Sequence, residues 1–157
     1  MALRCLGMAR QIRQTVLGLQ SLEVASSMEA IGELYLAKQE YQKAILCHEQ
    51  ALAIKEDKNA GRACVVTYTN LALVHQHRRD FETACYFYNA ALTAQFRMAQ
   101  EDRRAYRELA KTFASLGRMY HQAGVSSKAM AAMLKASQCM DEGGIPKKDS
   151  RRTRIGL

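Results

Sequence analysis

The sequence has one proline, Pro146, among its 157 residues. Because proline disrupts the interior of a helix, its scarcity fits helices along the whole chain. Long apolar runs are also missing. None approaches the roughly 18 consecutive residues that a membrane-spanning helix needs, so we expect a soluble or peripheral protein. Hydrophobic residues make up 48% of the chain, which at this length suffices for the core of one small domain.

Cysteine pairs and catalytic signatures are absent as well. The five cysteines are an odd number without C-x-x-C spacing, which favours a reducing compartment and buried, structural thiols. Glycine-rich phosphate loops, S-x-x-K and G-x-S-x-G do not occur. His75 and His77 look like a metal pair, but residues two apart on a helix point in different directions. We therefore predict no enzyme, no metal and no cofactor, and a small metal- or thiol-dependent enzyme is the least favoured hypothesis.

Three segments of the chain share one spacing of residues around Gly32, Ala72 and Gly117. Each has large apolar residues four and one positions before this small residue, a ring three positions after it, and alanines twelve and nineteen positions after it. The members are Met28, Ile31, Tyr35, Ala44 and Ala51; Tyr68, Leu71, His75, Ala84 and Ala91; and Phe113, Leu116, Tyr120, Ala129 and Ala136. The spacing places apolar side chains on one side of a helix, and the small residues let a second helix approach closely.

Two helices joined by a few polar residues must pack antiparallel, and one such hairpin cannot bury its apolar face alone. The predicted fold is therefore all-α, an α-solenoid of stacked antiparallel helix hairpins. Three hairpins are expected at about residues 21–60, 61–101 and 102–142. Residues 1–20 contain a helix over 2–17, which we interpret as half of a preceding hairpin. Residues 143–157 form a basic tail that we expect to be disordered.

The N-terminal segment has a second interpretation. Arg4, Arg10 and Arg13 precede the first acidic residue, Glu23. Such a composition is also typical of mitochondrial targeting peptides, and this alternative would place the protein in the mitochondrial matrix. The main expectation is the cytoplasm, or the cytoskeleton within it.

The repeated pattern resembles the tetratricopeptide repeat family, whose units of about 34 residues carry a large apolar residue, Leu-Gly, Tyr, Ala, an aromatic, Ala and a closing Pro. Glu56 and Phe96 stand where that proline would be. The spacing is long, 40 residues from Gly32 to Ala72 and 45 from Ala72 to Gly117, which predicts extended second helices or longer loops. This long spacing looks like that of the kinesin light chain and Pins-like branch of the family. The resemblance implies a non-enzymatic scaffold or adaptor that binds a peptide or helix of a partner protein, as a subunit of a larger assembly.

The resemblance also implies a groove along the first helix of each hairpin. Transferred position by position, its residues are Glu29, Glu33, Leu36, Val66, Asn70, Leu73, Gln76, His77, Lys111, Arg118 and His121. The set runs from acidic to basic, which would place the basic part of a bound segment near Glu29 and Glu33. These acids also argue against the carboxylate clamp of the chaperone-binding members. Asn70 is either a peptide-binding amide or a solvated helix residue. His48 and His75 stand where the family has aromatics, so we expect them in or near the core.

A second function hypothesis belongs to another class. The net charge of +8 would hold a basic subunit on a polyanion, either RNA or an acidic protein surface such as tubulin tails. Its contacts would be Arg78, Arg79, Lys147, Lys148, Arg151, Arg152 and Arg154. Salt separates the two hypotheses, because binding to a polyanion falls steeply with salt whereas an apolar groove contact does not.

Overall fold

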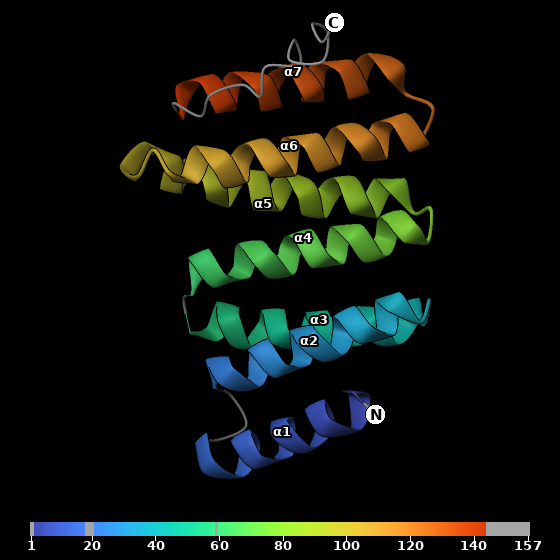
Figure 1. The fold of residues 1–157 in the computed structure, drawn as a ribbon, viewed down its shortest axis with the longest axis vertical. Coiled ribbons are helices and arrows are strands. Elements are labelled where there is room, and N and C mark those ends of the chain that lie inside the picture. The colour runs from blue at the N-terminus through green and yellow to red at the C-terminus, as the bar shows by residue number, and fades with distance from the viewer. Residues whose placement is uncertain (1, 18–20, 59, 144–157) are drawn as a thin grey trace, which may run out of the picture.

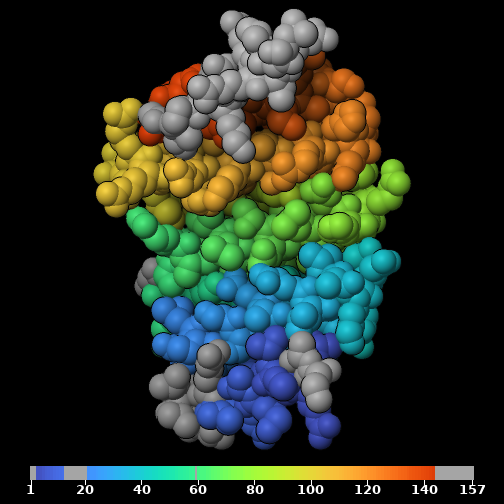
Figure 2. All heavy atoms as spheres, viewed as in Figure 1, coloured from blue at the N-terminus to red at the C-terminus, as the bar shows by residue number. Residues whose placement is uncertain are grey.

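The computed structural model describes residues 2–17, 21–58 and 60–143, which form seven α-helices stacked in chain order (Figure 1). These are α1 (Ala2–Leu17), α2 (Leu22–Ala37), α3 (Tyr41–Asp57), α4 (Gly61–His77), α5 (Phe81–Glu101), α6 (Ala105–Gln122) and α7 (Ser126–Glu142). Each helix packs on the next, most extensively within the pairs α2–α3, α4–α5 and α6–α7. The space-filling view shows the resulting column of layers (Figure 2). The predicted all-α solenoid of antiparallel hairpins is confirmed.

The long spacing between repeats results from long second helices in the hairpins. Helices α3 and α5 have 17 and 21 residues, and only short turns follow them. The helix expected over residues 2–17 is α1, which packs on α2. Beyond Gly143, the predicted basic tail lies outside the described residues. No helix in the part of the chain that the structure describes is long and apolar enough to cross a membrane.

The turn inside each hairpin repeats one geometry. The residue after the cap of the first helix adopts a left-handed conformation, with φ of 61° at Gln39, 64° at Arg79 and 77° at Gly124. The next backbone N–H then closes the turn on the helix, from Glu40 to Tyr35, from Asp80 to His75 and from Val125 to Tyr120, at 2.9 Å each. This bonding ends a helix and reverses the chain within three residues. Because the three turns are alike, the second helix of each hairpin packs on its first helix in the same orientation.

Small residues lie where the helices of a hairpin meet, as predicted. A Cβ atom on Gly32 would come within 2.7 Å of the His48 ring, and one on Gly117 within 3.1 Å of the Met133 Cγ. His48 and His75 are both buried, so their predicted packing role is confirmed. The largest core cluster joins α4 to α7 around Tyr88, Leu109 and Met119, and a smaller one joins α2 to α3.

The cysteines depart in part from the expectation of buried thiols. All five are free; Cys64 and Cys139 are buried and Cys47 and Cys85 are half-buried, but Cys5 is exposed. The prediction is wrong for Cys5 because α1 is covered by a neighbouring helix on one side only, and Cys5 lies on the other side.

Candidate partner-binding groove

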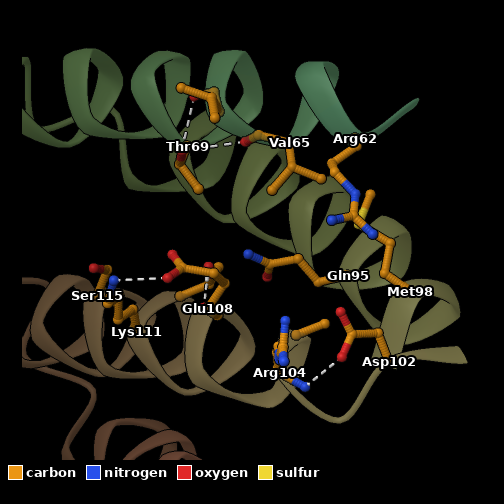
Figure 3. Close-up of a pocket in the computed structure, with 13 residues that line it drawn as sticks. Arg62, Val65, Thr69, Gln95, Met98, Asp102, Arg104, Glu108, Lys111 and Ser115 are labelled. Atoms are coloured by element: carbon orange, nitrogen blue, oxygen red, sulfur yellow. Dashed lines mark hydrogen bonds and ion pairs between the residues drawn. The ribbon is translucent and has the colours of Figure 1, made fainter. Parts of the chain in front are cut away.

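One hollow of the groove lies between α4 and α6, with the end of α5 as its floor (Figure 3). It encloses about 640 Å³. Val66 and Lys111, both predicted as groove residues, line its two walls, and Thr69 and Ser115 lie beside them. The first half of each of two neighbouring repeats therefore contributes to one concave site.

A second hollow of about 520 Å³ lies farther along the same two helices. It is lined by four predicted residues, Leu73, Gln76, His77 and Arg118. Gln76 donates to Gln122 Oε1 at 2.6 Å and accepts from the Tyr88 hydroxyl at 2.9 Å, so it links α4, α5 and α6. Burial raises the pKa of Tyr88 to about 12, which keeps this hydroxyl protonated as a donor. These bonds hold the walls of the groove at a fixed separation.

Glu29 does not present a charge to the groove, which corrects the expectation from the sequence. Its side chain is buried and forms an ion pair with Lys55 of α3, 2.6 Å from Nζ to Oε2. Thr67 of α4 donates to the other carboxylate oxygen at 2.5 Å and accepts from Lys55 Nζ at 3.0 Å. The carboxylate is neutralised between three helices, so it cannot attract the basic part of a ligand as predicted.

The remaining predicted residues lie outside the two hollows. Glu33 is exposed and accepts from Asn70 Nδ2 at 3.3 Å, so the Asn70 amide is bonded across α2 and α4. Leu36 is half-buried against the α3–α4 core cluster, which makes it a packing residue. His121 is exposed near the end of α6. The structure thus brings together the groove residues of the second and third hairpins and separates those of the first.

Gln95 is a site residue that the sequence reasoning missed. It is 4% exposed, its Oε1 has no hydrogen-bond partner in the part of the chain that the structure describes, and its amide faces the first hollow from α5 (Figure 3). A buried amide without a partner is costly, and native structures seldom keep one without a reason. The signal was present in the sequence, because Gln95 is a polar residue on the buried apolar stripe that includes Tyr88, Leu92 and Ala99.

The residues named for polyanion contact are only partly described. Arg78 donates to Gln42 Oε1 at 3.4 Å and Arg79 lies over the Phe81 ring at 6.0 Å, and both arginines are exposed. The basic residues of the tail fall outside the described part of the chain. No group of three or more His, Cys, Asp or Glu among the described residues could hold a metal ion.

Stacked hairpins with a groove along their first helices define an α-solenoid, and comparison with known proteins agrees. A family model described as tetratricopeptide repeat matches residues 1–57. The crystal structure of BtubC (BKLC) from P. vanneervenii, a kinesin light chain-like tetratricopeptide repeat protein, superposes with a TM-score of 0.81 at 20% identity. The match covers 99% of this chain and 62% of that one, and at this identity it concerns the fold. No curated protein matches the sequence.

Residues 1–57 therefore match the tetratricopeptide repeat family, and the described helices have the all-α solenoid fold of such repeats. Such repeats generally mediate contacts between proteins, and the fold typically serves non-enzymatic scaffolds.

Proposed function

We propose that the chain is a protein-interaction scaffold that binds a segment of a partner protein in the groove between α4 and α6, as a subunit of a larger assembly. One observation carries this proposal, the 640 Å³ hollow whose floor holds the buried Gln95 side-chain oxygen, which has no hydrogen-bond partner among the described residues. Sites for ligands are concave, largely preformed, and combine apolar walls with a few polar groups. Val65, Val66 and Met98 supply the apolar part of this lining.

A matched pair of variants tests the proposal. Val66 is 51% exposed inside the hollow, and Leu46 is 55% exposed on α3, outside it. Peptides selected from a random displayed library on the purified full chain would serve as probes. Val66→Arg is expected to weaken the selected peptides at least about tenfold by filling the hollow with a charged side chain, whereas Leu46→Arg leaves their affinity unchanged. Equal affinity for the two variants, or no selected peptides, would contradict the proposal.

The polyanion hypothesis remains an alternative and has its own readout. Affinity for the groove peptides and for RNA or acidic protein should be compared at low and high salt. A steep loss of binding with salt, independent of Val66→Arg, would favour the polyanion. The cytoplasmic location and its mitochondrial alternative also stay predictions, which imaging of the tagged chain can check.

A further inference from the structure

The outer face of α7 exposes a stripe of large apolar side chains at the end of the stack (Figure 1). Met130 is 75% exposed, Leu134 60%, Met133 44% and Met140 38%. Their spacing places them on one side of the helix. In the described part of the chain only α6 packs extensively on α7, and it covers the opposite side. A contiguous apolar stripe in water typically marks an interface.

The side of α7 that carries Met130 is the side on which the earlier second helices receive another helix. Counted from the aligned alanines, Met130 stands where α3 has Ile45 and α5 has Cys85. Ile45 lies in one core cluster with Leu71 of α4, and the Cys85 Sγ lies 3.0 Å from the Tyr120 hydroxyl oxygen of α6. This side of a second helix is therefore built to pack against a helix, and on α7 no described helix takes that place.

Leu134 indicates that the partner of α7 differs from a further repeat. It stands where α3 has Glu49 and α5 has Asn89, which are polar and stay exposed although another hairpin follows them. A regular repeat packed on α7 would therefore leave Leu134 in water. The segment after α7, residues 144–157, is a poor cover for the stripe, because it has five basic residues and its large aliphatic residues are only Ile145, Ile155 and Leu157.

A second copy of α7 matches this face when it runs antiparallel to the first. Paired about the middle of the helix, Met130 of one copy comes to lie opposite Met140 of the other, and Met133 comes to lie opposite Ser137. These four positions have the 3–4–3 spacing of a seam between two helices. Leu134 of each copy then lies beside the axis, next to its counterpart, so the side chain that a regular repeat would leave exposed becomes covered.

The two ends of α7 also match in charge in this pairing. Glu142, at the end of one α7, comes to lie opposite Lys128 in the first turn of the other. The first turn of α7 has no acidic residue and no side-chain cap. An acidic group near the N-terminus of a helix is favourable, so each copy supplies what the other lacks.

We propose that the exposed face of α7 binds α7 of a second copy of this chain, antiparallel and about a two-fold axis, in a symmetric dimer. Such isologous pairs are the commonest form of soluble oligomer. The dimer is independent of the proposed groove, because no α7 residue lines either hollow. It leaves both grooves open and presents two of them, which would strengthen binding to a partner that carries two segments.

Analytical ultracentrifugation of the full chain over a range of concentrations tests the dimer. We expect a monomer–dimer equilibrium in which Leu134→Arg raises the dissociation constant at least about tenfold, because it places a charge at the centre of the interface. Leu46→Arg is the matched control, since Leu46 is 55% exposed on α3, away from this face. It should leave the dissociation constant unchanged. Thermal unfolding of both variants checks that these exposed substitutions leave the fold intact.

Disulfide trapping tests the antiparallel register in a Cys5→Ser background, which removes the exposed native thiol. Met130→Cys and Met140→Cys should each fail to cross-link alone, because ten residues span about 15 Å of helix, and should cross-link when mixed. Cross-linking of either variant alone would overturn the antiparallel pairing. A monomer at every concentration, as expected if the tail or another protein covers α7, would overturn the dimer, and so would a dimer that persists in Leu134→Arg. None of these results affects the groove, which Val66→Arg tests separately.

Discussion

At the scale of single residues, the contact between Gly32 and His48 sets how closely α2 and α3 approach. Gly32→Ala would place a Cβ atom 2.7 Å from the Cε1 and Nε2 atoms of a fully buried ring. Alanine favours a helix over glycine by up to about 1 kcal/mol, but overpacking a core costs about 1–3 kcal/mol. We therefore expect net destabilisation, measured as a lower urea midpoint.

Gly7→Ala is the matched control for this substitution. Gly7 lies inside α1, and nothing stands within 4 Å of an added Cβ. Helix propensity then acts alone, so Gly7→Ala should stabilise the chain or leave it unchanged. If Gly32→Ala behaves like Gly7→Ala, the two helices are not in the tight contact described here.

His48 also makes stability depend on pH. Burial lowers its pKa below the ordinary 6.5, with Lys55 adding to the effect and Glu29 opposing it. Neither ring nitrogen has a hydrogen-bond partner in the described part of the chain. Well above pH 6.5 the ring is neutral in both states, so folding carries no penalty from its protonation. Below pH 6.5 the His48 imidazole binds a proton in the unfolded chain but not in the folded chain. The free energy of unfolding therefore falls with pH until the pH reaches the pKa of His48 in the folded chain.

The expected change is at most about 1.4 kcal/mol per pH unit, the value for one proton. Urea unfolding between pH 7.5 and 5 measures it. His48→Leu should flatten the pH dependence, whereas His121→Leu, an exposed control, should keep it. An unchanged slope in His48→Leu would mean that other groups cause the acid sensitivity.

At the scale of elements, a buried ion pair joins α2, α3 and α4. Lys55 and Glu29 are both buried and share Thr67 as a hydrogen-bond partner. Removing one charge leaves the other buried without a partner, which typically costs about 3–5 kcal/mol. Lys55→Ala should therefore lower the free energy of unfolding strongly, as chemical denaturation would measure.

We expect the lost stability to return when all three residues of this network are replaced by apolar ones. A triple variant with Lys55→Met, Glu29→Met and Thr67→Val should regain most of the loss, because such replacements are often neutral or stabilising. Lys43→Ala breaks the exposed pair with Glu40 and should have little effect. A small effect of Lys55→Ala would show that water reaches Glu29 and screens it.

At the scale of the whole molecule, the stack is expected to open from its N-terminal end. No side chain described in α1, over residues 3–12, is buried, whereas Leu109 and Met119 of α6 are fully buried in the largest core cluster. In repeat proteins each unit is stabilised by its neighbours, and among the described helices α1 packs on α2 alone, less extensively than α7 at the other end packs on α6. Amide hydrogen exchange should therefore be at least about tenfold faster in α1 than in α6. Equal protection would indicate one cooperative unit.

The sequence by itself determined the repeated architecture of this protein. The alignment around Gly32, Ala72 and Gly117 predicted stacked helix hairpins, and the described helices pack in such adjacent pairs. This succeeded because helix periodicity and close helix contacts depend on residues a few positions apart. It also placed His48 and His75 in the core.

Only the tertiary structure decided which polar side chains remain open to a partner. Glu29 is closed off by Lys55 and by Thr67, 38 residues away on another helix. Gln95 reaches the site from α5, the second helix of its hairpin. The groove positions transferred from the family lie only on first helices, so they did not include it. Arg62 and Arg104 meet across a cavity although they belong to different repeats. The physical reason is that charge pairing and burial depend on neighbours supplied by other helices, and the period of a single helix does not specify them.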